Sequence, residues 1–180
     1  CVDFSRPVVM VRAADVGMRG NETKEEVDAN GGLCALVEEI RQKAAGLMGM
    51  GSVVGKTSPK IAVLSPPCAD DGAHINLSTR FFTNPFDRDL HYALAMTAAQ
   101  NLAASCLAEG TIASEMCRLP VGHARAAPGL LDYEFNIRHP SGEAKVFITA
   151  EEEEQGEGER RRLVAASYIR TVAKVMEGDA

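Results

Sequence analysis

Apolar and polar residues alternate along several short segments, and this two-residue period is typical of β-strands with one buried face. The clearest segment is 130–138, in which apolar residues occupy every second position. The side chains expected on its buried face are Leu131, Tyr133, Phe135 and Ile137. The segment 74–82 alternates in a similar way and is predicted to be half-buried. Apolar or β-branched runs predict further strands at 7–17, 60–67, 143–150 and 163–178.

Two helices are predicted in the first quarter of the chain. Thr23 and Glu26 have the spacing of a capping box, which begins a short helix. The run Asn30-Gly31-Gly32 is expected to end it. A second helix should then extend from about 33 to 48, because its apolar residues recur every three or four positions. The charged residues expected on its solvated face are Glu38, Glu39, Arg41 and Lys43.

The segment 90–108 differs from these helices because it is small and apolar on nearly every side. A helix with so few charges must be buried on most faces. Asp87 or Asp89 is expected to cap its start and Gly110 to end it. A buried helix among several strands predicts an α+β fold, with a mainly antiparallel curved sheet wrapped around a central buried helix.

Composition restricts the classes of partner. The 180 residues suffice for a single domain with its own core. A net charge of -6 and an aromatic content of 5% disfavour nucleic acid as a partner. No apolar run approaches the roughly 20 residues of a membrane-spanning helix, so no membrane partner is expected. The charged tract 151–162 is interpreted as a solvated hairpin tip.

The cysteines and the glycine-rich stretch give no sign of a cofactor. Five cysteines, an odd number without any Cys-x-x-Cys spacing, indicate reduced thiols and a cytoplasmic location. Clustered Cys and His ligands for zinc are missing from the sequence. Gly55-Lys56-Thr57 lacks the earlier glycine and the preceding strand of a phosphate-binding loop. No metal or other cofactor is therefore expected.

The turn His139-Pro140-Ser141-Gly142 carries more chemistry than a tight hairpin needs. Gly142 lets backbone approach a ligand closely, and the hydroxyl of Ser141 can donate a hydrogen bond. Successive turn N–H groups can form an anion-binding nest, and a protonated His139 would add a charge-assisted bond. The alternative is a purely structural turn in which Pro140 and Gly142 set the backbone dihedral angles, and spacing alone favours that alternative.

Five segments together resemble a known family. In chain order they are PVVMVRAADVG, SPKIAVLSPP, LHYALAMTAA, RHPSG and IRTVAKVMEG. They resemble the C-terminal lobe of the PrpF-like aconitate and methylaconitate isomerases, over essentially all 180 residues. The resemblance implies one lobe of a diaminopimelate-epimerase-like fold, in which two lobes enclose the active site. Residues 1–180 would then be a single C-terminal-type lobe without its N-terminal counterpart.

The resemblance also implies a function. The family's chemistry is cofactor-independent isomerisation of an aconitate-like tricarboxylate by allylic proton transfer. The acid and base groups would come from the other lobe, so no catalytic residue is assigned here. This lobe would bind the carboxylates of a small di- or tricarboxylate. The residues implied for that role are His139, Ser141, Gly142, His91 and Thr97.

Two of these residues have ordinary alternatives. His91 is expected in the first turn of the buried helix, where the positive end of the helix dipole favours an anion, but a capping or core histidine is an equal reading. Tyr92 follows it where the family has a second histidine. Thr97, deep in the predicted helix, could bond back to a carbonyl.

Two other functions stay open. A lone lobe exposes the apolar face of the cleft, so the chain could be a non-catalytic half-protein that forms homo-oligomers or pairs with a separate N-terminal lobe. It could also be an amino-acid racemase or epimerase, since that fold also serves such enzymes. Epimerases of this fold use one thiol per lobe at the start of the central helix. Neither Cys106 nor Cys117 lies there, and all five cysteines are interpreted as structural or incidental.

Overall fold

The structure is a computed structural model that describes residues 1–84, 89–124, 129–154 and 159–168. The strands within these residues are β1 (Val2–Phe4), β2 (Arg6–Arg12), β3 (Lys60–Ser65), β4 (Leu77–Asn84), β5 (Asp89–Leu90), β6 (His123–Ala124), β7 (Leu130–His139), β8 (Gly142–Glu154) and β9 (Glu159–Tyr168). The helices are the 3-10 turn η1 (Ala14–Val16), α1 (Lys24–Asp28), α2 (Gly31–Leu47), α3 (Met96–Leu107) and α4 (Ile112–Met116). None of the described helices is long and apolar enough to cross a membrane.

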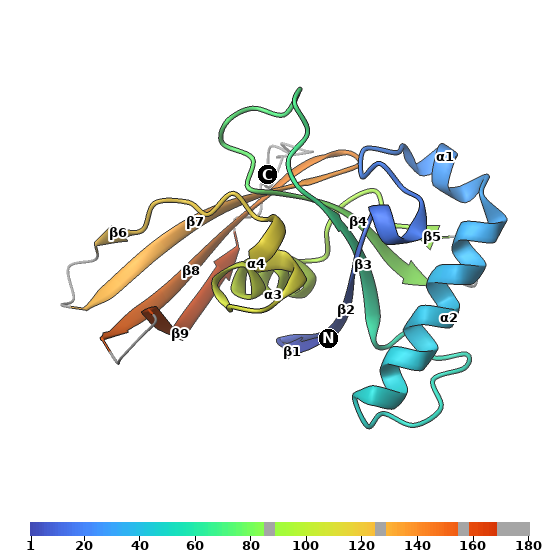
Figure 1. Cartoon of the computed structure of the whole chain (residues 1–180), viewed down its shortest axis with the longest axis horizontal. Coiled ribbons are helices and arrows are strands. Elements are labelled where there is room, and N and C mark those ends of the chain that lie inside the picture. Colours follow the sequence, from blue (N-terminus) through green and yellow to red (C-terminus); the bar gives the residue numbers. More distant parts are fainter. Residues whose placement is uncertain (85–88, 125–128, 155–158, 169–180) are drawn as a thin grey trace, which may run out of the picture.

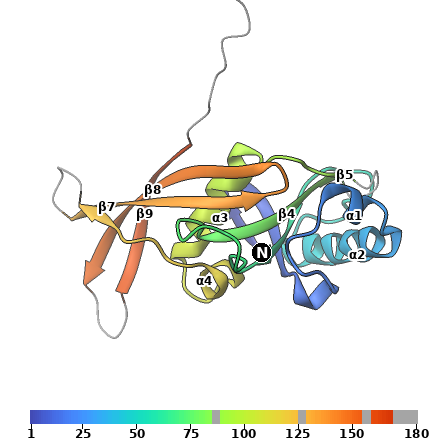
Figure 2. The ribbon, with the colours of Figure 1, turned by 90° about the horizontal axis from the view of Figure 1, so that it is seen from above.

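One mixed sheet organises the fold, in the order β1-β2-β3-β4-β7-β8-β9. The neighbours β2/β3 and β4/β7 are parallel, and the other pairs along this order are antiparallel. The helix α3 contacts β1 and β2 near one end of the sheet and β8 and β9 at the other. The sheet therefore curls around α3, which confirms the predicted α+β fold with a central helix (Figures 1 and 2).

The sheet carries a hydrophobic core on each face. Both views place β2, β3 and β4 between α3 and α2 (Figures 1 and 2). The core on the α3 side includes the predicted inward residues Tyr133, Phe135 and Ile137. The core on the other side joins β2, β3 and β4 to α2 through Val9, Ile61, Val63, Phe82, Leu33 and Val37. These three strands are central and covered twice, so the prediction of a half-buried strand at 74–82 was wrong.

The central helix is shorter than its apolar pattern predicted. It begins at Met96 and ends at Leu107, whereas 90–108 was expected. Residues 89–90 form β5 instead, because Leu90 pairs with Phe82 of β4. The N-cap is Ala95, which makes no side-chain capping bond. Asp89 therefore lies outside the helix, and Asp87 falls outside the described residues.

Asn101 ties the first hairpin to this helix. It is fully buried, and its Nδ2 donates to the carbonyl oxygens of Val2, Phe4 and Arg6 at 3.1, 3.0 and 2.8 Å. An amide on an otherwise apolar helix face is stable only if its donors are paired. These bonds hold one end of the sheet against α3.

The start of the chain confirms the predicted capping box and corrects the predicted role of Asn30-Gly31-Gly32. Thr23 Oγ1 accepts from Glu26 N, and the Glu26 side chain accepts from Thr23 N, so the capping box is present. Asn30 accepts from Leu33 N and caps α2. The glycine pair therefore begins the second helix. The prediction that it lies between the two helices was wrong. Asn30 satisfies one of the free N–H groups that every helix start exposes.

The charged face predicted for α2 is wrong at two positions. Arg41 is 1% exposed, and Glu38 is buried beside it. Arg41 Nε and Nη2 donate to the two carboxylate oxygens of Glu38 at 2.7 and 2.9 Å. Helical periodicity showed only where apolar residues lie and gave no sign that the segment 53–59 covers this side. Lys43 and Glu39 form the exposed pair that was expected.

Three strand boundaries also differ from the prediction. The first long strand, expected over 7–17, ends at Arg12 because the chain turns into η1. The charged tract 151–162 was expected to be a loop, but β8 and β9 extend into it. Opposed charges pair across the ladder, as in Glu151 with Arg162, and such pairs favour continued strands. The turn at 155–158 and the residues after 168 fall outside the described residues.

Candidate functional site

The candidate turn is a tight hairpin between β7 and β8. His139 pairs with Gly142, which leaves Pro140 and Ser141 as the two loop residues. Gly142 has φ +148°, a backbone region that L-residues rarely adopt. The glycine is therefore required by the geometry of the turn, whether or not a ligand approaches it.

The turn is anchored on the carbonyl oxygen of Tyr92. Ser141 N donates to this oxygen at 3.1 Å and Ser141 Oγ donates to it at 2.8 Å. The same oxygen lies 3.1 Å from Nδ1 of His139. The turn thus fixes the segment that leads into α3. A ligand carboxylate would compete with this carbonyl for the proton of the Ser141 hydroxyl.

His139 is a buried, neutral ring in this arrangement. Burial lowers the pKa of His139 below its ordinary value. Nδ1 of His139 faces the Tyr92 carbonyl oxygen and also lies 3.3 Å from Ser141 Oγ. Backbone hydrogen bonds at Tyr92 and Glu143 oppose the effect of burial on the pKa but are smaller than it. The geometry therefore favours His139 as a positioned neutral group over the cationic donor considered from the sequence.

His91 and Thr97 lie in other places than their expected ones. His91 belongs to the segment between β5 and α3, so its predicted position in the first helical turn was wrong. Its Nδ1 lies 2.6 Å from the carbonyl oxygen of Ala93 and 3.1 Å from the backbone nitrogen of the same residue. Thr97 lies in the first turn of α3 and is half-buried, since the helix starts later than predicted.

Tyr92 is held by its side chain as well. Its hydroxyl donates to Glu25 Oε1 at 2.7 Å, and Lys24 Nζ lies 5.6 Å from the ring centroid. The bond to the Glu25 carboxylate raises the pKa of Tyr92. The phenol thus connects α1 to the segment before α3. It occupies a structural contact that an imidazole would be too short to make.

A polar cavity of about 210 Å³ lies beside the turn. Three segments form it: the loop before α1, the loop after β3, and the adjoining ends of β4 and β7 with the turn. The lining residues are Gly20, Asn21, Glu22, Thr23, Cys68, Asp70, Asp71, Ser78, Arg80, Arg138, His139 and Pro140. Of the five residues implied by resemblance, His139 alone lines it.

Arg80 is the most deeply buried cation of this cavity. It is 5% exposed, and it projects from the central strand β4. Its Nε donates to the carbonyl oxygen of Glu22 at 2.6 Å and its Nη1 to that of Thr79 at 3.0 Å. Burial lowers the pKa of Arg80, although a guanidinium stays charged at any physiological pH.

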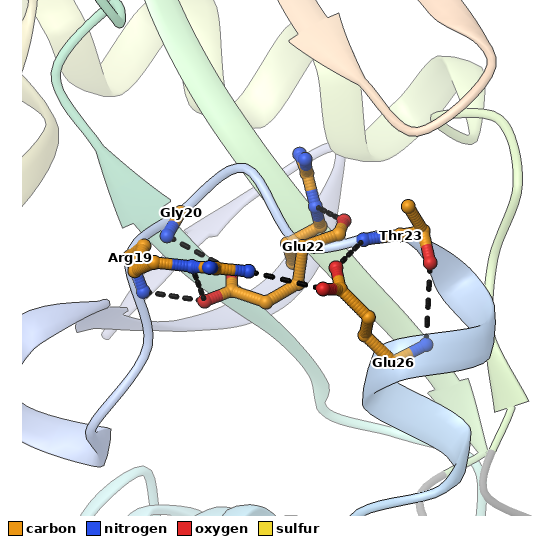
Figure 3. A network of polar contacts seen from close by, with 6 residues as sticks. Arg19, Gly20, Glu22, Thr23 and Glu26 are labelled. Carbon is orange, nitrogen blue, oxygen red and sulfur yellow. Dashed lines mark hydrogen bonds and ion pairs between the residues drawn. The ribbon is translucent and has the colours of Figure 1, made fainter.

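The carboxylates of the cavity have other partners. The Glu22 side chain accepts from the backbone N–H groups of Arg19 and Gly20, and it also pairs with the Arg19 side chain (Figure 3). Asp71 accepts from Cys68 N at 2.8 Å and from Ser78 Oγ at 3.3 Å. These acids shape the loops around the cavity. In the described part of the chain, no group of three His, Cys, Asp or Glu residues could hold a metal ion.

Sequence reasoning missed the cavity residues for identifiable reasons. Arg80 occupies the polar phase of an alternating strand, which ordinarily faces solvent. Only the second layer of α1 and α2 turns that face inward. Cys68, which was interpreted as structural or incidental, lines the cavity and is half-buried. Cys106 does lie in the core, where burial beside Cys117 raises its pKa well above the ordinary value.

The family model described as PrpF protein matches residues 1–180 of the chain. The chain belongs to the PrpF family. It is 34% identical over 179 residues to the putative isomerase YbhH of Escherichia coli (strain K12). It is 32% identical over 177 residues to the (4E)-oxalomesaconate Delta-isomerase of Novosphingobium sp. (strain KA1). These matches confirm the family that the sequence segments indicated.

The same comparisons define how much of a PrpF protein the chain represents. The two matches cover 99% and 98% of this chain but 45% and 43% of the relatives. The chain thus spans less than half the length of these relatives. The crystal structure of methylitaconate-delta-isomerase matches with a TM-score of 0.63 at 24% identity, over 93% of this chain and 45% of that one. This likeness confirms the fold.

Proposed function

We propose that this PrpF chain forms one lobe of a cofactor-independent isomerase for unsaturated di- and tricarboxylates such as aconitate. Its lobe supplies groups that bind substrate carboxylates, and His139, Ser141 and Gly142 lie at the edge of that site. His91 and Thr97 belong to the segment that the turn holds at the start of α3. The acid and base groups come from a second lobe.

The relatives support the class of substrate. Their names specify a (4E)-oxalomesaconate Delta-isomerase, a 4-oxalomesaconate tautomerase and a 3-methylitaconate isomerase. Each name refers to an unsaturated carboxylic acid and to the movement of a double bond or a proton. Such reactions share one step, in which a base removes a proton from the carbon next to a conjugated system. The proton then returns at a different carbon.

One structural observation carries the proposal: the turn assigned to carboxylate binding borders a polar cavity that contains a buried guanidinium. His139 and Pro140 form one wall of this cavity, and Arg80 lies within it. When an allylic proton leaves, negative charge spreads into the conjugated carboxylate. A fixed guanidinium stabilises that charge more strongly than water does, because the protein dipoles need no reorganisation.

A second lobe is part of the proposal. The chain spans 45% of the length of the E. coli relative, so the remaining length can provide a partner lobe. Two copies of this chain, or this chain and a separate N-terminal lobe, would close the site between them. Light scattering after size exclusion measures which of these arrangements forms.

The test is proton NMR of this chain with cis- and trans-aconitate in D2O. Saturation transfer from protein to ligand should show binding of the acids, with butyrate as a monocarboxylate control that binds weakly. The isomer ratio and deuterium uptake report proton transfer. Uptake is expected where paired lobes complete the site. If neither cis- nor trans-aconitate gives saturation transfer or exchange, the proposed function is overturned.

A further inference from the structure

We propose that the cavity around Arg80 is a binding site for a small carboxylate anion, with the Arg80 guanidinium as its principal ligand. The anion site rests on the geometry of the cavity. Only the choice of a carboxylate over other small anions rests on the proposed function. The cavity is distinct from the hydroxyl of Ser141, which is engaged with the Tyr92 carbonyl.

The first argument compares the two deeply buried arginines of the chain. Arg41 is 1% exposed, and Glu38 neutralises it through two hydrogen bonds. Arg80 is 5% exposed, but its hydrogen bonds in the described structure go to two neutral carbonyls. No described carboxylate forms an ion pair with it. The charges of Glu22 and Asp71 favour the guanidinium from a distance, but burial outweighs them. A buried cation without a carboxylate in direct contact is costly, so the environment of Arg80 favours binding of an anion.

The second argument concerns the free edge of the guanidinium. Nε and Nη1 have carbonyl partners, whereas Nη2 has no hydrogen bond to the described residues. Nη2 is also not one of the fully buried atoms without a partner among the described residues, so part of its surface is open. Since Arg80 lines the cavity, this donor is available to a ligand there. A guanidinium with one free edge can bind a carboxylate oxygen with a short, charge-assisted bond.

The neighbouring acids leave this donor available. Asp71 is held by Cys68 N and Ser78 Oγ, and Arg138 Nε lies 3.7 Å from its Oδ1. Arg138 is half-exposed and adds a second guanidinium to the lining. The acids reduce the overall positive field of the cavity. Recognition therefore depends on direct contact with Arg80, and binding should be modest in strength.

The volume of the cavity limits the ligand. About 210 Å³ lies below the roughly 300–1,000 Å³ of pockets that enclose a drug-sized ligand. That space accepts a carboxylate and one or two carbons, and it is too small for a nucleotide. A tricarboxylate would place one arm in the cavity and extend the remainder past His139 and Pro140.

Binding is tested with tricarballylate, a saturated tricarboxylate that cannot isomerise, and with inorganic phosphate. Calorimetry on this chain should show tricarballylate binding that Arg80→Gln weakens at least about tenfold, the loss expected for one charged hydrogen bond. Arg6→Gln is the matched control, because Arg6 is exposed on β2 and outside the lining. It should leave the affinity unchanged within about twofold.

Cys68 offers a second measurement that does not depend on a substitution in β4. Its half-buried side chain lines the cavity, whereas Cys1 is exposed elsewhere. Bound tricarballylate should slow alkylation of Cys68 by iodoacetamide at least about threefold and leave Cys1 unchanged. Mass spectrometry of the peptides gives both rates in one sample. This measurement also tests binding in the cavity if Arg80→Gln does not fold.

The outcomes separate the site from the reaction. Binding and Cys68 protection that require Arg80 would support the site whether or not aconitate exchange occurs. The isomerase proposal fails separately, if aconitate gives neither saturation transfer nor exchange. Phosphate binding without tricarballylate binding, lost in Arg80→Gln, would keep an anion site and reject the carboxylate. Tricarballylate binding that Arg80→Gln leaves intact, or no protection of Cys68 at saturating ligand, would overturn the inference.

Discussion

Replacing Arg41 with methionine removes the ion pair that holds α2 to the segment after it. The guanidinium donates to both carboxylate oxygens of Glu38 and also reaches three backbone carbonyls. These carbonyls belong to Val53, Ser58 and Pro59, at 3.1, 3.2 and 3.3 Å. Methionine matches the apolar stem of arginine but ends where the guanidinium begins, and it has no donor. The substitution therefore leaves one carboxylate and several carbonyls without this partner.

The expected cost follows from burial. Removing one member of a buried ion pair costs about 3–5 kcal/mol, because the remaining charge is left uncompensated. Glu38 keeps a hydrogen bond from Gln42 Nε2 at 2.7 Å, so the lower end, about 3 kcal/mol, is expected. Lys43→Met is the control on the same helix. Lys43 is 75% exposed and pairs with Glu39, and exposed pairs of this spacing contribute only about 0.3–0.5 kcal/mol.

Urea unfolding measures the difference. With an m value of about 2 kcal/mol/M, a loss of about 3 kcal/mol lowers the midpoint by roughly 1.5 M. The control should shift by roughly 0.2 M on the same scale. The double variant Glu38→Met with Arg41→Met should lose less stability than the two single variants lose together, because no lone charge is left behind. Equal midpoints for Arg41→Met and Lys43→Met would refute the reasoning.

Two further predictions concern the residues around the cavity. Gly20→Ala should cost roughly 2–4 kcal/mol, since φ is +92° and the new Cβ would lie 2.1 Å from Ser65 Oγ. Gly17→Ala, at φ +72° with open space, should cost only about 1–2 kcal/mol in the same urea assay, and equal losses would contradict the clash. Burial lowers the pKa of His139 in the folded chain below 6.5, so the unfolded state binds more protons as the pH falls through that value, and folding stability should decline there. Urea midpoints at pH 7.5 and pH 5.5 should differ more for the unchanged chain than for His139→Gln, and an equal difference would argue against a buried neutral ring.

Because the sheet curls, helix α3 can contact strands at both of its ends. Helix α3 touches both ends of the sheet, and the segment before it is fixed by the turn at 139–142. Contacts between residues about 50 positions apart, such as Ser141 with Tyr92, therefore set the position of the cavity wall. Hydrogen bonds of this kind arise from the tertiary fold. They leave no local pattern that could be recognised beforehand.

Local patterns nevertheless predicted much of the framework. The strand at 130–138 and its inward face follow from alternation alone, and the capping box at Thr23 follows from spacing. The apolar segment around 96–107 showed that a helix must be buried. The order of short segments along the chain indicated the PrpF family, which the family model confirms over 1–180. All of these features depend on residues close together in sequence.

The sequence by itself therefore determined most of the longer elements, the fold class and the family. Tertiary structure alone decided which polar residues became buried and what they met there. Arg41 and Arg80 both occupy polar positions of amphipathic segments, yet each ends up inside. Periodicity describes one face of an element, while burial of the other face depends on segments brought together by folding. For the same reason Arg41 pairs with the carboxylate of Glu38, whereas Arg80 lines a cavity.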